Sequence, residues 1–317
     1  MTQRVLITGI GGQDGTILAR RLNELDYSVV GTRQPGSAIS EHLGRAEVVE
    51  ADLRDAELCR ALVLDAQPDV IFHFAGISSV GYSWDYPVET AAVNGNSAVA
   101  LLDALLELQT NSGTERTFVN ASSAEIFAGA SQSPQNEQTP IAPLSPYGAS
   151  KAFSHTMTQV YRAKGLKASN AIFYNHESTF RPTKFVTRKI TAAAAAIARG
   201  KQSTLELGNL DARRDWGWAP DYVDATLLMA SHRQGDDFVI ATGAAHSVHE
   251  FVEAAFRAAG IPDWHDLVSS NRAFGRPADS AEMVGDASKA KQILGWEPTK
   301  RFDEVVAAMV EHDLSLL

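Results

Sequence analysis

Two residues four positions apart, Tyr147 and Lys151, could together carry out acid–base chemistry. A spacing of four places both side chains on one face of a helix. A free tyrosine titrates at about pH 10 and is a poor base at neutral pH, but a nearby cation favours the phenolate. Upstream, Ser123 ends a predicted strand, where its hydroxyl could hold a reacting oxygen, and Glu125 follows two residues later. These residue types predict the oxidation or reduction of an alcohol with a tyrosine as the base.

A glycine-rich turn near the start of the chain has the pattern of a dinucleotide-binding loop. Residues 8–15 read Thr-Gly-Ile-Gly-Gly-Gln-Asp-Gly, directly after an apolar strand and at the start of a predicted helix. The spacing of Gly9, Gly12 and Gly15 permits a tight turn, close approach of the backbone to a pyrophosphate, and close packing of the helix on the strand. The helix amino terminus then stabilises the negative charge. In this context the glycines predict dinucleotide binding rather than a plain turn.

The end of the second predicted strand bears on which dinucleotide is bound. An NAD enzyme usually has Asp or Glu there, whereas residues 29–34 read Val-Val-Gly-Thr-Arg-Gln. Arg33 could face a 2′-phosphate, so we expect NADP in preference to NAD, with a solvated surface arginine as the alternative. Asp52 and Leu53, after the third strand, are placed for the adenine, although Asp52 could equally cap a helix. Ala75, after the fourth strand, is a further expected cofactor contact.

These residues have to be positioned by regular elements, and the first half of the chain alternates between strands and helices. Strands are predicted at residues 4–8, 28–31, 47–50, 70–74, 117–121 and 168–174. Helices are predicted at residues 14–25, 56–64, 87–108 and 147–164. This alternation predicts an α/β fold with a doubly wound parallel sheet of the Rossmann type.

The second half of the chain has a different pattern and predicts a smaller C-terminal α/β lobe for the substrate. Residues 176–188 look irregular and polar, and helices are expected at 190–199, 248–259, 288–294 and 303–313. We expect residues 1–174 to form the dinucleotide-binding domain, with a return of the chain at about 209–243. Residues 175–208 and 244–317 would then form the substrate lobe.

The composition argues against several other classes of protein. The net charge is -10 without a basic stripe, so we expect no nucleic acid partner. No apolar run reaches membrane-spanning length and the first strand begins at Arg4, so we expect a cytoplasmic protein without a signal peptide or membrane partner. Cys59 is the only cysteine, and His73, His176 and His249 lack ligand spacing, so we expect no metal.

The glycine loop, the serine at a strand end and the Tyr-x-x-x-Lys pair resemble the extended short-chain dehydrogenase/reductase superfamily over essentially the whole chain. Within that superfamily, several stretches resemble GDP-mannose 4,6-dehydratases. They are Gly12-Gln13-Asp14-Gly15, Asn175-His176-Glu177-Ser178, Phe185-Val186-Thr187-Arg188-Lys189-Ile190, Gly208-Asn209-Leu210-Asp211, Arg214-Asp215-Trp216-Gly217, Asp221-Tyr222-Val223, Arg276-Pro277-Ala278 and Leu294-Gly295-Trp296-Glu297-Pro298.

The resemblance implies an NADP-dependent lyase that converts GDP-mannose into GDP-4-keto-6-deoxymannose. Tyr147 would take the proton of the 4-hydroxyl while hydride moves from carbon 4 to NADP⁺. Glu125 would remove the acidified proton on carbon 5, water would leave from carbon 6, and the stored hydride would return there. The implied catalytic residues are Ser123, Glu125, Tyr147 and Lys151.

The resemblance also implies a set of ligand contacts. The cofactor contacts are Gly9, Gly12, Gln13, Asp14, Gly15, Arg33, Asp52, Leu53, Ala75, Tyr147, Lys151 and His176. The substrate contacts are Asn175, Lys184, Arg214, Arg276 and Asp279. Of these, the three cations are the expected partners of the diphosphate, because arginine binds phosphate in a bidentate manner. Each of the three could instead be a partner in a surface salt bridge.

The chain departs from the family pattern at several positions. Ser123 stands where threonine is usual, Ala124 replaces serine, Thr179 replaces proline and Asp279 replaces glutamate. The loop after Arg33 is short and has one arginine, whereas by resemblance a longer loop reaches a neighbouring subunit and builds a tetramer. We therefore expect a homodimer formed by the helices that begin near Pro87 and Tyr147, with a tetramer as the alternative.

Three other functions stay open at this point. A reductase or epimerase of a nucleotide sugar would use Ser123, Tyr147 and Lys151 but would not need Glu125. A decarboxylase of a nucleotide-linked uronic acid can also have a glutamate there. A nucleotide-sensing protein that has lost its chemistry would be expected to have a damaged Tyr/Lys pair, and here both residues are intact.

Overall fold

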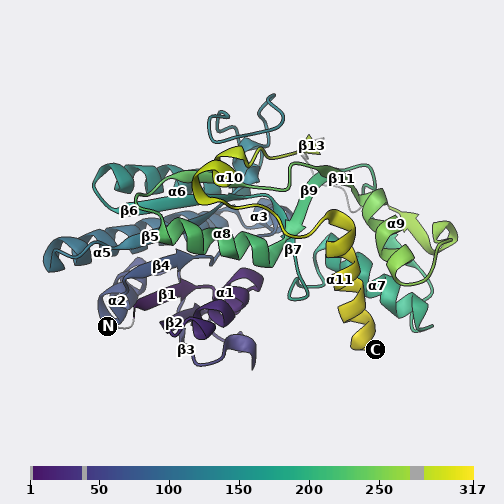
Figure 1. The fold of residues 1–317 in the computed structure, drawn as a ribbon, viewed down its shortest axis with the longest axis horizontal. Coiled ribbons are helices and arrows are strands. Elements are labelled where there is room, and N and C mark those ends of the chain that lie inside the picture. Colours follow the sequence, from purple (N-terminus) through teal and green to yellow (C-terminus); the bar gives the residue numbers. More distant parts are fainter. Residues whose placement is uncertain (1–2, 38–40, 272–281) are drawn as a thin grey trace.

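The computed structural model describes residues 3–37, 41–271 and 282–317. Its centre is a seven-stranded sheet in the order β10-β6-β5-β4-β1-β2-β3, in which neighbouring strands are parallel (Figure 1). The strands are β1 (Arg4–Thr8), β2 (Ser28–Arg33), β3 (Glu47–Glu50), β4 (Val70–His73), β5 (Thr117–Ser123), β6 (Lys167–Phe173) and β10 (Asp237–Ile240). The predicted parallel sheet is confirmed.

Helices cover both faces of this sheet, as in a doubly wound fold. Strands β4 and β5 are buried along their whole length, because a parallel sheet is covered on both sides. On one face α1 (Gln13–Glu24) and α8 (Ala219–Ser231) pack together, and α8 contacts β5 and β6. On the other face lie α2 (Ala56–Ala66), α5 (Ser97–Ser112) and α6 (Pro146–Ala163). Each face has its own apolar core.

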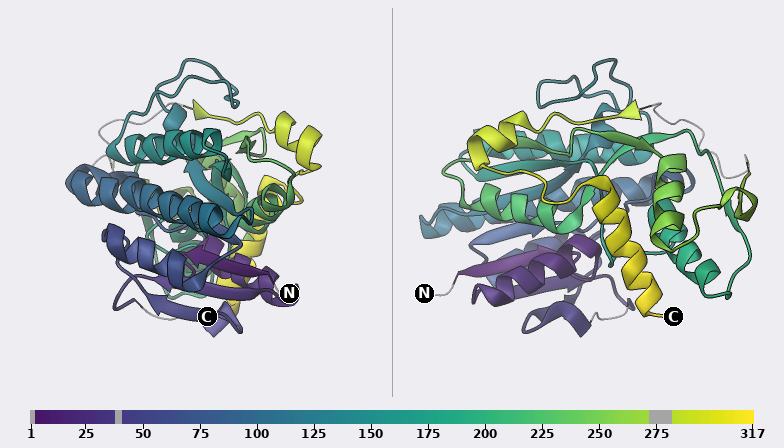
Figure 2. Two further views of the ribbon diagram at one scale, coloured as in Figure 1. Left: turned by 90° about the vertical axis from the view of Figure 1, so that its left-hand side faces the viewer. Right: turned by 45° about the vertical axis from the view of Figure 1, so that its right-hand side comes forward.

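The remaining elements form a second, smaller body at the carboxyl end of the large sheet (Figure 2). Strand β9 (Arg213–Trp218) pairs with β7 (Asn175–Glu177), β11 (Ala245–Ser247) and β13 (Glu282–Met283), and β8 (Leu205–Leu207) pairs with β12 (Val268–Ser270). Helices α7 (Val186–Ala198), α9 (Val248–Ala258) and α11 (Phe302–Ser315) pack against one another around a separate apolar core. Helix α10 (Ser288–Leu294) instead contacts β10 and α8.

Several predicted boundaries were wrong for identifiable reasons. Helix α3 (Val80–Asp85) was not predicted; it is a short aromatic turn capped by Ser79, whose hydroxyl accepts from the Tyr82 amide at 3.2 Å. The helix predicted at 87–108 is α4 (Pro87–Ala91), a π-helical turn (Ala92–Asn96) and α5 in succession. Residues 176–188 are not wholly irregular, because β7 ends at Glu177 and α7 begins at Val186.

Within the described ranges, no helix combines the length and apolar character that crossing a membrane requires.

Candidate active site

A cavity of about 880 Å³ opens at the carboxyl ends of β1, β4, β5 and β6, the usual position of a ligand site in an open α/β sheet. On the sheet side it is lined by the glycine loop, residues 121–125 and residues 173–177. On the other side it is lined by residues of the smaller body, from α7, β9 and the segment after β8. The cavity therefore lies between the two bodies.

The glycine loop has the shape that a pyrophosphate needs. Gly9 has a φ of +73°, a conformation that favours glycine, and a Cβ there would lie 2.8 Å from the Ala75 amide nitrogen. A Cβ on Gly15 would lie 2.4 Å from the Gly9 carbonyl oxygen, so helix α1 approaches β1 as closely as only glycine allows. The amino terminus of α1 faces the cavity through Gly12, Gln13 and Asp14. This cradle fits a dinucleotide.

Replacing Gly15 with alanine should weaken binding of a nicotinamide dinucleotide by at least about tenfold, because the added methyl group pushes α1 away from β1. Calorimetry measures this affinity directly. The matched control is Gly11→Ala, because a Cβ on Gly11 meets nothing within 4 Å. The control should bind the dinucleotide as tightly as the native protein does. An equal loss of affinity in both variants would show that the close contact between α1 and β1 does not contribute to dinucleotide binding.

Tyr147, Ser123 and Lys151 come together in the cavity wall. Burial raises the pKa of Tyr147 to about 12, although a hydrogen bond with Ser123 opposes the rise. Burial lowers the pKa of Lys151 to about 8, and its ammonium donates to the Ala121 carbonyl at 2.8 Å. The protein's own charges therefore do not bring the pKa of the phenol towards neutral pH. A further positive group beside Tyr147 is needed for it to lose its proton at neutral pH.

Glu125 lies at the same end of the cavity. It follows β5 in a short 3₁₀ turn (Ala124–Phe127), and its amide donates to the Ser123 hydroxyl at 3.3 Å. Its side chain is half-buried and lines the cavity, and its charge raises the pKa of Tyr147. A carboxylate so placed can accept a proton from a substrate that is also in reach of Tyr147.

His176 and Asp14 form an ion pair between the glycine loop and β7. Nε2 of His176 lies 3.1 Å from both carboxylate oxygens of Asp14, and Nδ1 lies 2.7 Å from the Tyr174 carbonyl oxygen. Because these oxygens only accept, both ring nitrogens donate and the ring is an imidazolium. Burial lowers the pKa of His176, but Asp14 outweighs burial and the pKa is raised overall. The two bodies are thus held together beside the pyrophosphate cradle.

The family is decided by comparison with known proteins. Residues 6–309 match the sequence model for GDP-mannose 4,6 dehydratase. The chain belongs to this family. It is 41% identical to GDP-mannose 4,6 dehydratase 2 of Arabidopsis thaliana over 98% of this chain and 87% of that protein. It is 37% identical to the human GDP-mannose 4,6 dehydratase over 98% of this chain and 91% of that protein.

Solved structures share the fold at lower sequence identity. The UDP-glucose 4-epimerase of Thermus thermophilus, solved with NAD, is 25% identical with a TM-score of 0.85, and the match covers 99% of this chain and 100% of that chain. The UDP-glucose 4-epimerase of Thermotoga maritima, solved with UDP-glucose, is 24% identical with a TM-score of 0.86, and the match covers 97% of each chain. The second likeness concerns the fold alone.

Two residues of the family stretch Arg214-Asp215-Trp216-Gly217, Asp215 and Gly217, have structural roles outside the chemistry. Asp215 is buried and accepts from the Thr242 amide (2.9 Å), the Thr242 hydroxyl (2.6 Å) and the Gly243 amide (2.9 Å), so it fixes the loop after β10 to β9. A Cβ on Gly217 would lie 2.3 Å from the Tyr222 ring, so this tight strand-to-helix packing requires glycine.

The substrate contacts predicted from the sequence lie in the cavity where the structure describes them. Asn175, Lys184 and Arg214 all line it, and Arg214 is buried, with Nη1 donating to the Arg213 carbonyl at 2.8 Å. Arg276 and Asp279 lie outside the described residues.

Four predicted cofactor contacts are not among the described residues that line the cavity: Arg33, Asp52, Leu53 and Ala75. Asp52 pairs with Arg54 at 2.6 Å. It does not cap a helix, since Asp55 caps α2. Leu53 is buried and Ala75 packs against Gly9.

Arg181 is a cation of the site that was not predicted from the sequence. Its guanidinium lines the cavity, lies 3.8 Å from the centre of the Phe185 ring, and has Nε 3.2 Å from a carboxylate oxygen of Glu177. It also lowers the pKa of Tyr147, against the effect of burial. The available signal was its spacing of four from Glu177 in the Asn-His-Glu-Ser stretch.

Groups of three or more His, Cys, Asp or Glu side chains that could hold a metal ion are absent from the residues described.

Proposed function

We propose that this chain is an NADP-dependent 4,6-dehydratase that converts GDP-mannose into GDP-4-keto-6-deoxymannose. Family membership over nearly the whole chain supports the activity. The observation that carries it is that Glu125 lies beside Ser123 and Tyr147 at the mouth of a dinucleotide cradle. An alcohol oxidation needs the tyrosine and serine, and an elimination needs a separate base.

The glycine loop would hold the dinucleotide, which when bound supplies a positive ring, accepts hydride from carbon 4 of the sugar and returns it to carbon 6. Ser123 holds the 4-oxygen and Tyr147 takes the 4-hydroxyl proton. Lys151, with its pKa of about 8, is charged at neutral pH and stabilises the negative charge that develops on Tyr147. Tyr147 is 9% exposed and lines the cavity, so its hydroxyl is reached from the cavity side.

Glu125 takes the proton from carbon 5 once carbon 4 is a ketone, and the hydroxyl of carbon 6 leaves with one proton as water. When hydride has returned to carbon 6, carbon 5 takes up one proton from solvent through Glu125, which completes the 4-keto-6-deoxy sugar. The half-buried position of Glu125 keeps its carboxylate at the cavity surface, where it can reach the sugar. Lys184, Arg214 and Arg181 are the cations that we assign to the diphosphate, since all three line the cavity. Residues 1–174 with about 209–243 would bind NADP, and residues 175–208 and 244–317 would bind the sugar nucleotide.

Incubation with a panel of sugar nucleotides tests the activity, with product mass and NADPH absorbance as the readouts. We expect loss of one water from GDP-mannose with no net change in NADPH. Consumption of NADPH would indicate a reductase, and isomerisation without loss of water would indicate an epimerase.

The preference for NADP depends on Arg33. Its guanidinium pairs with Glu50 across the β2–β3 register at 2.5 Å and also donates to the Ser37 carbonyl. A guanidinium has five donors, so these contacts leave donors for a 2′-phosphate. We expect NADP⁺ to bind more tightly than NAD⁺. We expect Arg33→Ala to reduce the difference between the two affinities.

Calorimetry with both dinucleotides measures this difference in affinity. Glu50→Gln is the matched control, because it removes the competing acid and should widen the preference for NADP⁺. Equal affinities of the native protein for the two dinucleotides would refute the assignment.

The quaternary structure we propose is a homodimer formed by the α4–α5 region and α6. Large apolar side chains are exposed on these helices, with Val88 83% exposed, Phe153 46% and Val160 44%.

Phe153→Asp combined with Val160→Lys should convert the dimer to a monomer, because both charges would be buried in the interface. Light scattering reports the mass. Ile293→Lys on α10, 45% exposed, is the matched control and should stay dimeric. A tetramer that is stable on dilution would contradict the dimer.

A further inference from the structure

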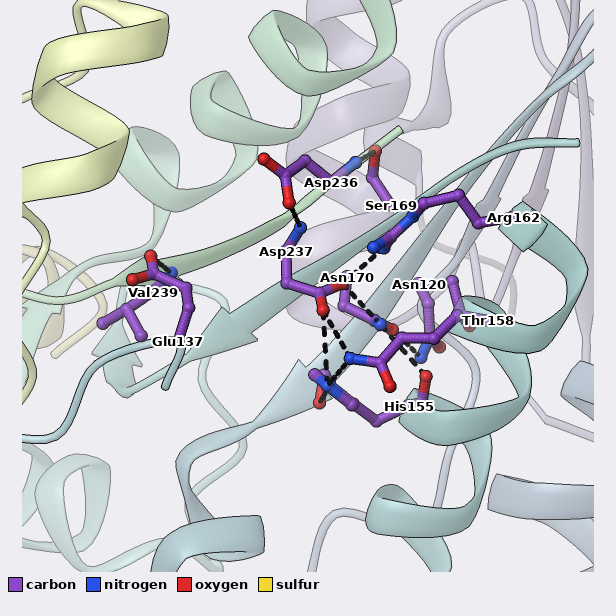
Figure 3. Close-up of polar contacts among 12 residues, drawn as sticks. Asn120, Glu137, His155, Thr158, Arg162, Ser169, Asn170, Asp236, Asp237 and Val239 are labelled. Carbon is purple, nitrogen blue, oxygen red and sulfur yellow. Dashed lines mark hydrogen bonds and ion pairs between the residues drawn. The ribbon is translucent and has the colours of Figure 1, made fainter. Parts of the chain in front are cut away.

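Helix α6 has four polar side chains at a constant spacing of four, all facing the sheet: Tyr147, Lys151, His155 and Gln159. This spacing forms one stripe along the helix. The first two residues belong to the machinery proposed above. His155 is buried and Gln159 is exposed, and the mechanism uses neither of them (Figure 3 shows the cluster around His155).

The first three residues of the stripe bond to three consecutive residues at the carboxyl end of β5. The bonds join Lys151 to the Ala121 carbonyl (2.8 Å), His155 to the Ser122 hydroxyl (3.0 Å), and Tyr147 to the Ser123 hydroxyl. The contact of His155 is therefore the middle one of three that hold this strand end against α6. Ser122, between the other two strand residues, is buried and borders the cavity.

The contacts of Gln159 determine which nitrogen of His155 has the proton. The amide nitrogen of Gln159 lies 2.6 Å from a carboxylate oxygen of Asp237 and must donate to it. The same nitrogen lies 3.2 Å from Nε2 of His155, which therefore accepts its other hydrogen. The proton of the neutral ring is then on Nδ1 and is donated to the Ser122 oxygen. His155 thus fixes the position of the Ser122 side chain.

Asp237, on β10, anchors this arrangement from the edge of the sheet. One carboxylate oxygen accepts from Asn170 of β6 at 2.8 Å and from Arg162 of α6. Asn170 in turn donates to the His155 carbonyl at 3.1 Å. Burial raises the pKa of Asp237, but Arg162 outweighs burial and holds it below its ordinary value, so Asp237 is ionised. His155 is therefore held by three contacts. Its ring bonds to Ser122 and to Gln159, and its backbone carbonyl accepts from Asn170.

We propose that His155 is a positioning residue of this enzyme, which holds Ser122 and thereby sets the Ser123 hydroxyl against Tyr147. The inference rests on the proposed function, since its consequence is a slower first chemical step. Movement of the strand end would lengthen the Ser123–Tyr147 bond without changing the nucleotide and diphosphate contacts on the far side of the cavity. We therefore expect an effect on kcat rather than on KM.

The test compares His155→Phe, which keeps the ring and removes the hydrogen bonds, with His155→Asn, whose amide nitrogen can replace the Nδ1 donor. His155→Phe should lower kcat about tenfold with KM for GDP-mannose changed by less than about twofold. His155→Asn should recover most of the lost kcat. Ser122→Ala should give a similar loss, and adding it to His155→Phe should cost little more, because both remove one contact.

The rate of dinucleotide reduction and the loss of water are followed separately in each variant. Unchanged kcat in His155→Phe, or an Asn variant no faster than the Phe variant, would overturn the positioning role. A loss of thermal stability at unchanged kcat would likewise assign His155 to folding alone. If the native protein reduces the dinucleotide but releases no water, the dehydratase proposal fails, while His155 is still judged on the rate of reduction.

Discussion

Replacing Glu125 with glutamine should leave binding of GDP-mannose intact and slow dehydration by about a hundredfold to ten-thousandfold. The side chain lines the cavity beside Ser123 and Tyr147, and glutamine keeps its size but has no basic oxygen. Oxidation at carbon 4 depends on Tyr147, Lys151 and the dinucleotide, so it should still occur. The variant should therefore accumulate reduced dinucleotide and stall before water is lost. Single-turnover absorbance and product mass measure the two steps.

The matched control for this experiment is Glu137→Gln. Glu137 is another partly buried carboxylate in the segment after β5, but it accepts from the Val239 amide at 2.8 Å instead of lining the cavity. Its replacement should leave the rate of dehydration unchanged. Elimination at the native rate in Glu125→Gln would show that Glu125 is not the base, and the dehydratase assignment would lose its main structural support.

Replacing Lys151 with methionine should lower activity by about a hundredfold while making the ligand-free protein more stable. The side chain is 5% exposed, and burial lowers its pKa from 10.5 to about 8. That difference corresponds to a penalty of about 3 kcal/mol on the charged form. Removing the amine also removes its bond to the Ala121 carbonyl, which contributes about 1 kcal/mol. We expect a net gain of about 1 to 2 kcal/mol in the free energy of unfolding at pH 7.

The pH dependence of this gain follows from the direction of the pKa shift. Because the folded pKa lies below the unfolded one, the unfolded chain binds more protons between about pH 8 and pH 10.5. The penalty from Lys151 is therefore fully present below about pH 8 and is lost as the pH rises towards 10.5. The stability advantage of Lys151→Met over the native protein should shrink over the same interval, as denaturant titrations at several pH values would show.

Lys167→Met is the control for Lys151→Met. Lys167 also donates to a backbone carbonyl, that of Ala230 at 2.9 Å, but it lies at the start of β6 away from the cavity and is more exposed. Its replacement should give no gain in stability and no loss of activity. A Lys151→Met variant that is less stable than the native protein at pH 7 would contradict the account.

The parallel sheet could be predicted because its strands are short, apolar and separated by helices of regular period. Val70–His73 and Thr117–Ser123 are buried on both faces, which leaves little ambiguity in the pattern. Strand β7 could not be predicted in this way. It is a polar stretch of three residues, and it is a strand because Asn175 pairs with Trp216, forty-one positions later in the chain. Tertiary pairing, not local pattern, determines such an element.

The same limit applies to the site. The hydrogen bond of Tyr147 with Ser123 follows from a strand end and a helix face, which the sequence indicates directly. Arg33 looked like an unpaired cation because its partner Glu50 is on a different strand, and only the register of β2 on β3 brings them together. Arg181 was missed since its approach to the cavity depends on β7.

Reaction in heavy water tests most directly whether this chain removes water from GDP-mannose through a base acting on carbon 5. The native protein is incubated with GDP-mannose and NADP⁺ in deuterium oxide, and the product is analysed by mass spectrometry and proton NMR. Glu125 lines the cavity, where its proton can exchange with solvent. We therefore expect a 4-keto-6-deoxy sugar that has lost one water and has gained one deuterium at carbon 5. A product that retains its water, or one that has lost water but has no deuterium at carbon 5, would contradict this mechanism.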